Sequence, residues 1–473
     1  MAWETVIGLE VHVQLLTRSK MFCGCANRFG APPNTLVCPV CLGLPGALPV
    51  PNEHAIRLAT RAAHALGCRV QLTSVFARKN YFYPDLPKGY QISQFDLPLA
   101  TGGAVVIDSP ERGRLTVGVT RLHVEEDAGK SMHDRFPGQT AVDLNRAGAP
   151  LVEIVSEPDM RSPAEARAYL TTLKQVLRYC DVSDCNMEEG SLRVDANVSV
   201  RREGDTRLGT KTEVKNMNSF ANVERALTVE RDRQIALLES GERVEQVTLL
   251  FNAGTGQVRP MRSKEESHDY RYFPDPDLPP LVLSPRWVEE QRADLPELPD
   301  AKQERFMAIH ALPPYDAGVL VAERPIADYF EAVVAAGVEP KTASNWVIND
   351  AMRGYNESGS FAVSPAQLAS LVALVNDGTV SNQAAKRIFP ELANSAESSR
   401  AVAERLGLLQ VGDLDALGGW VDEVLAANPK EVERYKGGEV KLIGFFVGQV
   451  MKKSQGKADP KKIQPVLQEK LSS

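Results

Sequence analysis

Apolar and polar residues alternate strictly near the start of the chain, from Val6 to Leu15. The polar side carries Gly8, Glu10, His12 and Gln14, and the apolar side carries Ile7, Leu9, Val11, Val13 and Leu15. A period of two residues predicts a β-strand with one apolar face and one polar face. The polar face of this strand presents a carboxylate, an imidazole and an amide in a row.

Three later stretches, 122–125, 191–200 and 210–216, repeat this alternation and are also predicted to be strands. Their polar positions hold His123, Glu125, Ser191, Arg193, Asp195, Asn197, Ser199, Lys211, Glu213 and Lys215. For any one strand, an ordinary solvated face is the alternative. Four such strands together favour a polar cradle on one side of a sheet.

One acidic residue, Glu153, interrupts an otherwise apolar strand at 151–155. A carboxylate in such a place has to be paired or bound to a metal ion, because burial of a lone charge is costly. Magnesium in proteins typically binds carboxylates together with phosphate oxygens of a substrate. The candidate magnesium ligands of the cradle are Glu10, His12, Glu125 and Glu153.

Capping residues and helical periodicity predict three helices among the strands. Asn52 begins one that ends at Gly67, and Ser162 begins another that runs to Tyr179. The third spans 220–240. Strands and helices alternate here without a regular β-α-β repeat, which favours an α+β domain with a mixed or antiparallel sheet.

The composition changes near Asp275. Residues 275–280 and 294–300 are rich in proline and aspartate and are predicted to be linkers. The stretches that follow have helical periodicity, and the predicted helices cover 326–337, 342–353, 365–376 and 381–388, with a last helix pair joined near 456–460. The predicted domains are an α+β domain at 1–292, an all-α domain at 297–408 and a small all-α tail at 409–473.

Length and composition agree with several globular domains. The chain has 473 residues, of which 43% are hydrophobic and 24% charged. No apolar run approaches the roughly 20 residues that cross a bilayer, and the opening Met-Ala-Trp-Glu lacks the basic start of a signal peptide. We therefore expect a cytoplasmic protein. The net charge is −7, but ten Lys and Arg stand against five Asp and Glu from Lys430 onward, which indicates either a basic binding tail or a solvated helix face.

Four of the seven cysteines form the pattern Cys23-x-Cys25-x12-Cys38-x2-Cys41. Two close pairs of thiolates brought together by a loop are typical of a structural zinc site, and four unrelated thiols are the alternative. Four protein ligands leave no open coordination position, so the predicted zinc is structural and not catalytic. The uneven spacing of the other three cysteines is unlike a disulfide framework.

The segment from Arg78 to Gln91 is predicted to be a loop that combines lysine with aromatic rings. Aromatic faces beside lysine suit a base, a ribose phosphate or the end of an RNA. The alternative is a loop that packs its rings on the core.

Several long strings of residues resemble the family of B subunits of tRNA-dependent aspartyl/glutamyl-tRNA amidotransferases (GatB). These strings are Ile7–His12, Leu44–Pro49, Lys79–Ser93, Asp143–Glu153, Met187–Asn197 and Tyr270–Pro280. The helical middle and the tail match the family in arrangement. The resemblance implies a glutamine-synthetase-like cradle, a helical domain and a tail similar to the small YqeY domain.

The resemblance also implies a reaction. ATP phosphorylates the side-chain carboxylate of Asp-tRNA(Asn) or Glu-tRNA(Gln), and ammonia then displaces the phosphate to give the amide. Phosphoryl transfer of this kind depends mainly on positioning and on charge neutralisation. The implied catalytic and magnesium-binding residues are Glu10, His12, Glu125 and Glu153, and the implied ATP-binding residues are Lys79, Tyr81, Lys88, Tyr90, Arg193 and Asp195.

No stretch resembles an amidase with a catalytic lysine and serines, so the ammonia is expected from a partner. In the family this partner is the amidase A subunit, which acts as a glutaminase, and a small C subunit braces the pair in a heterotrimer. The helical and tail domains are expected to bind the tRNA, with local support from Lys452, Lys453, Lys457, Lys461 and Lys462.

Two other functions stay open at this point. The first is a non-catalytic tRNA-binding or chaperone-like role, which leaves Glu153 and the Glu10–His12 row without a purpose. The second is a free-standing ammonia ligase akin to glutamine synthetase, which would amidate free aspartate or glutamate. The sequence does not decide between Asn-tRNA and Gln-tRNA as the main product.

Overall fold

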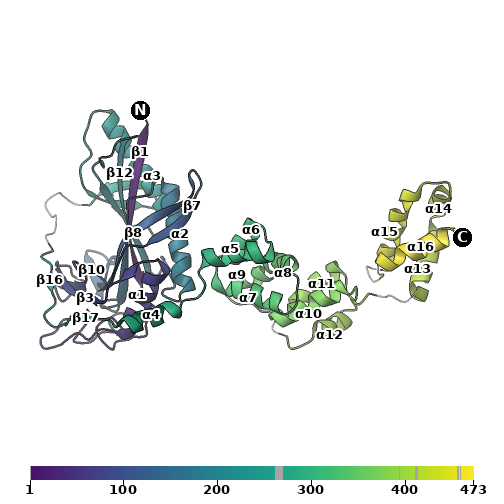
Figure 1. Ribbon diagram of the computed structural model, residues 1–473, viewed down its shortest axis with the longest axis horizontal. Helices are drawn as coiled ribbons and strands as arrows, with labels where there is room; N and C mark the ends of the chain where they lie inside the picture. The colour runs from purple at the N-terminus through teal and green to yellow at the C-terminus, as the bar shows by residue number, and fades with distance from the viewer. Residues whose placement is uncertain are drawn as a thin grey trace. The chain divides into compact units, whose positions relative to one another are not determined.

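The structure is a computed structural model. It describes residues 2–261, 270–393, 395–410, 414–454, 458 and 460–472, without the side chains of 133–135, 414–416, 460 and 461. The chain divides into two compact units, Met1–Pro299 and Asp300–Ser473 (Figure 1). Each unit is described by itself.

The first unit is built on a ten-stranded sheet with the order β15-β14-β13-β12-β1-β11-β8-β6-β2, in which β7 also pairs with β8. The strands are β1 (Trp3–Gln14), β2 (Arg69–Val70), β6 (Ala100–Thr101), β7 (Ala104–Ser109), β8 (Gly113–Glu126), β11 (Pro150–Ser156), β12 (Leu192–Arg202), β13 (Thr212–Lys215), β14 (Thr248–Asn252) and β15 (Gln257–Pro260). Only the β13–β14 pair is parallel among these pairings. The alternating stretches of the sequence are therefore confirmed as neighbouring strands, with β1 between β12 and β11.

The apolar face of β1 lies in the core of this unit. Ile7, Leu9, Val11 and Val13 are almost completely buried, whereas Glu10 and His12 on the other face are partly exposed. Burial of one such aliphatic side chain contributes about 1.5–3 kcal/mol, so the alternation determines which face of the strand turns inward.

Three helices confirm the capping signals, namely α1 (Glu53–Ala65), α2 (Pro163–Tyr179) and α3 (Phe220–Glu239). The side chain of Asn52 accepts hydrogen bonds from the backbone of His54 and Ala55, and Ser162 caps α2 in the same way at Glu165. Helices α2 and α3 pack on each other, and they cover β7 and β12 respectively (Figure 1). They supply the other half of the core.

Two predictions for the first unit were wrong in part. The expected loop 78–91 begins and ends in strands, β4 (Ala77–Asn80) and β5 (Tyr90–Ser93), which pair with each other. β4 also pairs with β16 (Phe273–Pro274). The expected linker 275–280 instead packs on this unit, because Asp275 is buried (3% exposed) and accepts a hydrogen bond from Arg78 at 2.7 Å.

Short elements complete the first unit. They are β3 (Thr73–Ser74), β9 (Lys130–Phe136), β10 (Gln139–Asp143), β17 (Leu281–Val282) and α4 (Pro285–Ala293). β17 pairs with β3, and β9 pairs with β10. The chain after Asp275 therefore returns to the first unit through β17 and α4 before the second unit begins.

The described residues of the second unit form helices joined by loops, with an isolated bridge between Val380 and Leu409. Its helices are α5 (Pro299–His310), α6 (Pro314–Leu320), α7 (Arg324–Ala335), α8 (Pro340–Trp346), α9 (Met352–Ser358), α10 (Pro365–Asn376), α11 (Asn382–Ile388), α12 (Ser399–Arg405), α13 (Leu414–Ala427), α14 (Pro429–Lys436), α15 (Ile443–Lys453) and α16 (Pro460–Ser472). The helix predicted at 342–353 is continuous across a π-helical turn, Val347–Ala351, that joins α8 to α9. The last predicted pair corresponds to α15 and α16.

Two separate hydrophobic clusters lie within this unit, one formed by residues between Phe306 and Ala403 and one by residues between Leu417 and Leu471. The domain boundary proposed between 408 and 409 stays a prediction. A mixed sheet with helices followed by a helical region agrees with the fold class expected from the sequence. None of the helices in the described part of the chain is both long and apolar enough to cross a membrane.

Candidate functional site

The register of four adjacent strands places ionisable side chains in one row across the sheet. His12 of β1 lies opposite Arg193 of β12 and Glu153 of β11, and Glu153 lies opposite His123 of β8. Glu125 is two residues beyond His123 on the same strand, so the two side chains share a face. Residues more than one hundred positions apart in the sequence thus become direct neighbours.

Two histidines and two carboxylates meet in this row. The Nε2 atom of His12 is 3.3 Å from a Glu153 oxygen and 3.5 Å from a Glu125 oxygen. The Nε2 atom of His123 is 3.2 Å from Glu153 and 3.7 Å from Glu125. Ser93 of β5 donates a hydrogen bond to Glu125 at 3.0 Å. We call His12, His123, Glu125 and Glu153 the carboxylate centre.

Burial and mutual charge perturb each group of the carboxylate centre. Burial disfavours the charged histidines, but the contacts with Glu153 and Glu125 outweigh it, so the pKa of His12 rises and that of His123 rises to about 9. Burial also disfavours both carboxylates, yet the two histidines hold the pKa of Glu125 and of Glu153 below the ordinary value. Protonated histidines therefore supply the cationic charge that the buried carboxylates need.

A cation can take over that role. Ligand atoms of His12, Glu125 and Glu153 all lie within 4.8 Å of one another, and this is one of the two groups of possible metal ligands in the described chain. Two carboxylate oxygens and one imidazole nitrogen suit a hard divalent ion that leaves positions open for phosphate oxygens. The donor set therefore fits the magnesium ion that the sequence predicted.

Glu10 lies two residues from His12 on the same face of β1 but outside this group of ligand atoms. It accepts a hydrogen bond from Asn197 at 3.1 Å, and its register partner on β12 is Asp195. Burial and the nearby charges of Glu153 and Glu213 raise the pKa of Glu10. Its assignment as a fourth magnesium ligand stays a prediction.

Two of the predicted ATP-binding residues, Arg193 and Asp195, lie on β12 and form ion pairs there. Arg193 forms an ion pair of 2.9 Å with Asp127. Asp195 accepts a hydrogen bond of 2.7 Å from Lys215, which also pairs with Glu213. Each of these charged groups already has an opposite charge beside it.

Lys79 stands between the carboxylate centre and an aromatic row. Its ammonium lies over the ring of Tyr270 at 4.8 Å, and the charges of Glu125 and Glu153 help to raise its pKa against the effect of burial. The row consists of rings in successive contact, Tyr83, Tyr81, Tyr270, Tyr272 and Phe95. Phe95 and Tyr272 stack in parallel at 4.2 Å, and Phe95 is half exposed.

Lys88 and Tyr90 take part in other contacts. They line a cavity of about 100 Å³ together with Glu126, Cys23 and Cys41. Lys88 forms a buried ion pair with Glu126, and Tyr90 lies beneath the guanidinium of Arg78 at 4.1 Å. Tyr90 lies opposite Asn80 in the pairing of β4 with β5 and is therefore next to Lys79 along these strands, but Lys88 and Tyr90 make different side-chain contacts from those of Lys79.

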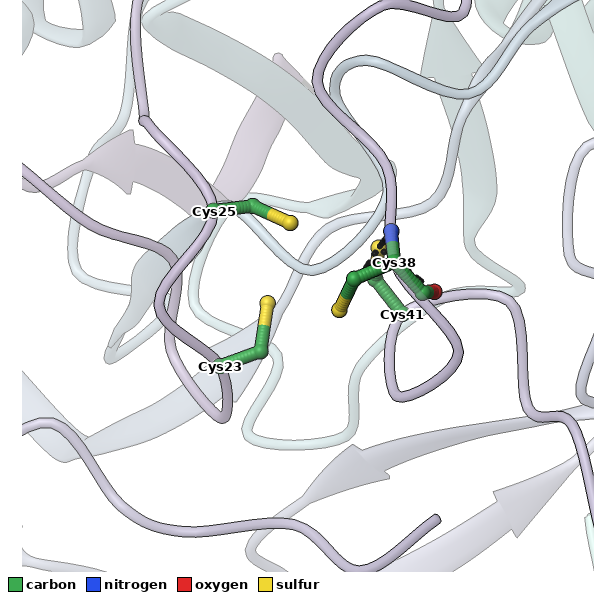
Figure 2. A group of neighbouring side chains, drawn as sticks. All are labelled: Cys23, Cys25, Cys38 and Cys41. Atoms are coloured by element: carbon green, nitrogen blue, oxygen red, sulfur yellow. Dashed lines mark hydrogen bonds between the residues drawn. The ribbon is translucent and has the colours of Figure 1, made fainter.

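Two loop segments bring the four predicted zinc ligands together. Cys23 and Cys25 follow β1, and Cys38 and Cys41 come from a tight turn in which the backbone nitrogen of Cys38 donates to the Cys41 sulfur at 3.1 Å. One sulfur atom from each residue lies within 4.8 Å of the other three. Figure 2 shows the four side chains converging on a common point.

The chemistry of this sulfur cluster fits a zinc ion. A hydrogen bond from Cys23 lowers the pKa of Cys41 to about 4, aided by the Cys38 backbone and the Lys20 ammonium against the effect of burial. The pKa of Cys25, in contrast, is raised to about 11, mainly by burial of its thiol. Four soft ligands at this separation are suited to tetrahedral zinc, with Zn–S bonds of about 2.3 Å.

Three of the five tail lysines predicted to bind tRNA have described side chains. Lys452 and Lys453 are exposed in the last turn of α15, and Lys453 forms an ion pair with Glu423. Lys462 is exposed in α16. Lys457 and the side chain of Lys461 lie outside the described residues.

Two functional candidates were not assigned from the sequence. His123 shares a face with Glu125 in the predicted strand 122–125, so the alternation alone was enough to predict it as a member of the polar cradle. Tyr272 was harder to predict from the sequence. Only the pairing of β16 with β4 brings residue 272 beside the strand that carries Lys79. Long-range strand pairing of this kind has no local signature.

Comparisons with known proteins identify the family of the chain. A family model described as the GatB/GatE catalytic domain matches residues 5–289, and one described as the GatB domain matches residues 328–471. Similar proteins include the aspartyl/glutamyl-tRNA(Asn/Gln) amidotransferase subunits B of Alkalilimnicola ehrlichii and Moorella thermoacetica, each 54% identical over 100% of both chains. That of Geotalea uraniireducens is 53% identical, again over 100% of both chains.

The first unit, which contains the sheet, is therefore a GatB/GatE-type catalytic domain. The chain belongs to the family of B subunits of tRNA-dependent amidotransferases, as the matches along its whole length show. Membership makes it part of a carbon–nitrogen ligase.

Proposed function

We propose that the chain carries out the ligase reaction on misacylated Asp-tRNA(Asn), Glu-tRNA(Gln) or both. The side-chain carboxylate oxygen attacks the γ-phosphorus of ATP, and ADP leaves. Ammonia then attacks the acyl carbon, phosphate leaves, and the nitrogen loses a proton to give the amide. The proposed location is the cytoplasm, because the product is an aminoacyl-tRNA for protein synthesis.

The observation that carries the proposal is the carboxylate centre, in which ligand atoms of His12, Glu125 and Glu153 lie within 4.8 Å of one another. These residues would hold a magnesium ion, which neutralises phosphate charge when it is bound. Their oxygen and nitrogen atoms are held by paired strands of one sheet. Such positioning matters because phosphoryl transfer needs little covalent help from the protein.

The surroundings of the centre suit the two substrates. Lys79 lies close enough to Glu125 and Glu153 for their charges to raise its pKa. A phosphate group bound there would be next to the Lys79 ammonium. The half-exposed face of Phe95 and the adjoining tyrosines offer rings on which a base can stack. We assign ATP binding to Lys79, Tyr81, Arg193 and Asp195 on this basis, and retain Lys88 and Tyr90, which line the cavity beside the sulfur cluster, as members of the set.

A glutamine-synthetase-like cradle is the finer fold proposal. Its support is a sheet whose polar face gathers carboxylates for phosphoryl transfer to a substrate carboxylate. The proposed zinc ion in the sulfur cluster is structural, since four cysteine ligands leave no position for a substrate.

Ammonia is proposed to come from a separate amidase that hydrolyses glutamine, with a small third protein in the same heterotrimer. The cysteines do not offer a separate nucleophile, because four of the seven form the sulfur cluster and the other three are buried. The tail lysines, with the YqeY-like tail that carries them, are proposed to contact the body of the tRNA. Exposed Lys452 and Lys462 support this assignment.

The test is Glu125→Ala in the assembled amidotransferase, with tRNA-dependent ATP hydrolysis as the measurement. Loss of a buried magnesium ligand should lower the rate at least about 100-fold, which corresponds to about 3 kcal/mol. The matched control is Glu111→Ala, which removes an exposed carboxylate from the turn before the same strand and should leave the rate unchanged. An unchanged rate for Glu125→Ala would support the non-catalytic alternative.

The second alternative has its own measurement. Purified complex is incubated with ATP, ammonia and free aspartate or glutamate, with and without each misacylated tRNA. The proposal requires amide formation only with tRNA. Activity on the free amino acids would instead identify a free-standing ammonia ligase.

A further inference from the structure

Lys20 is a fully buried lysine beside the sulfur cluster. Its side chain has 0% exposure, and its ammonium lies 2.7 Å from the Leu36 carbonyl, 3.5 Å from the Leu144 carbonyl and 3.7 Å from the Cys41 sulfur. A lysine ammonium carries a full positive charge and three donors. Burial of such a charge costs several kcal/mol unless an opposite charge lies close by.

Lys302 in the second unit shows the usual solution. It is also buried, and carboxylates of Glu331 and Asp328 lie 2.6 Å and 3.8 Å from its ammonium. Lys20 has no carboxylate within ion-pair distance among the residues that the structure describes. The two carbonyl groups are dipoles without net charge, and the nearby Glu126 pairs with Lys88. The Cys41 sulfur is therefore the possible anion in contact with the Lys20 ammonium.

The charge of the cluster depends on its state. Four neutral thiols would leave Lys20 buried without a counter-charge. Four thiolates around one divalent ion carry a net charge of −2, which the ammonium reduces to −1. Hydrogen bonds to a metal-bound thiolate also help to hold the ligand in place, as partners behind metal ligands generally do.

We infer that Lys20 is a positioning residue that supplies the counter-charge of a tetrathiolate metal site at Cys23, Cys25, Cys38 and Cys41. The inference rests on the zinc assignment of the proposed function and extends it to a residue outside the ligand set. Lys20 also links the two halves of the site, because its backbone nitrogen bonds to the Cys25 carbonyl at 3.0 Å while its ammonium reaches Leu36 and Cys41.

The same side chain connects the sulfur cluster with the sheet. Leu144, whose carbonyl Lys20 contacts, precedes Arg146, and Arg146 forms an ion pair of 3.4 Å with Asp127 at the end of β8. Asp127 in turn pairs with Arg193 beside the carboxylate centre. Loss of the Lys20 charge is therefore expected to destabilise the turn at 144–148 and to weaken metal binding.

The experiment uses the full-length chain and three variants. Lys20→Gln keeps a hydrogen-bond donor but removes the charge, Lys20→Arg keeps the charge, and Lys302→Met is the control for loss of a buried lysine elsewhere. Zinc affinity is measured by competition with a chelator, and Co²⁺ loading gives a thiolate-to-cobalt charge-transfer spectrum.

Lys20→Gln is expected to bind zinc about 10- to 100-fold more weakly than the unmodified chain, with a shifted Co²⁺ band, as for other losses behind metal ligands. Lys20→Arg should restore most of the affinity, and Lys302→Met should leave it unchanged. Wild-type affinity in Lys20→Gln, or an equal loss in Lys20→Arg, overturns the inference. If Lys20→Gln does not fold, the zinc affinity of Lys20→Arg decides, since a loss of about tenfold or more although the charge is kept overturns the inference.

An unmodified chain that binds neither ion overturns both this inference and the proposed zinc site. That result leaves the amidotransferase reaction itself standing, because tRNA-dependent ATP hydrolysis by the assembled complex and the Glu125→Ala variant test it separately.

Discussion

The sulfur cluster and the carboxylate centre are two metal-binding candidates built in opposite ways. The four cysteines fall within 19 consecutive residues and come from loops, while His12, Glu125 and Glu153 come from three strands and span 142 residues. The cluster offers four soft ligands and no open position. The carboxylate centre offers two hard carboxylate ligands and one imidazole, and keeps room for phosphate oxygens.

This difference shows that a metal site can be held together either by the metal itself or by long-range strand pairing. A loop site needs its metal to hold two segments together, so its geometry and its stability depend on the ion. A site on paired strands is held by the backbone ladder and by the core beneath it, and its charges balance even without a metal because two histidines face two carboxylates. Removal of each metal should therefore have different consequences.

The largest expected effect is on the sulfur cluster. Cys38→Ser should reduce zinc from about one ion per chain to nearly none and lower the thermal midpoint of the first unit, because metal binding contributes to folding there. Elemental analysis and a melting curve measure both. The control Cys68→Ser changes a buried cysteine outside the cluster and should retain zinc. Zinc in Cys38→Ser at the wild-type level, or none in the unmodified chain, would contradict the prediction.

The carboxylate centre should instead respond to pH when no metal is present. The pKa of His123 lies at about 9 in the folded chain and at 6.5 ordinarily, so folding favours its protonated form. This stabilisation is fully present below pH 6.5 and is lost as the pH rises through 9. Urea denaturation in a chelator should show a decrease of at most about 3 kcal/mol over that range.

His123→Gln tests the origin of this decrease. The variant should be less stable than the unmodified chain at pH 6 and should show a flatter dependence from pH 6.5 to 9. His54→Gln, an exposed histidine at the start of α1, serves as the control and should keep the full dependence. A slope that persists in His123→Gln would place the titrating group elsewhere.

The smallest expected effect concerns Glu10, which lies on the right face of β1 but outside the group of converging ligand atoms. Glu10→Gln keeps the acceptor for Asn197 and removes only the charge. We expect tRNA-dependent ATP hydrolysis in the assembled complex to decrease about tenfold or less, which is about 1.4 kcal/mol. A loss as large as that of Glu125→Ala would make Glu10 a fourth ligand and remove the distinction between it and the centre.

Much of the fold was accessible from local signals. Asn52 and Ser162 predicted the starts of their helices, because a side-chain acceptor at the first turn satisfies free backbone N–H groups. The linker predicted at 275–280 was wrong in part, because aspartate beside proline is typical of turns. The Asp275 carboxylate is buried because Arg78, 197 residues away, bonds to it, and no local pattern contains that partner.

The sequence by itself determined the strands and their polar faces, the helix starts and the clustering of four cysteines, because each depends on residues a few positions apart. Only the tertiary structure decided the register that places His12, Glu153 and His123 in one row, the position of Glu10 outside the group of converging ligand atoms and the burial of Lys20. Those features depend on which distant segments pair. A shift of one residue in any strand would turn the same polar face into the core.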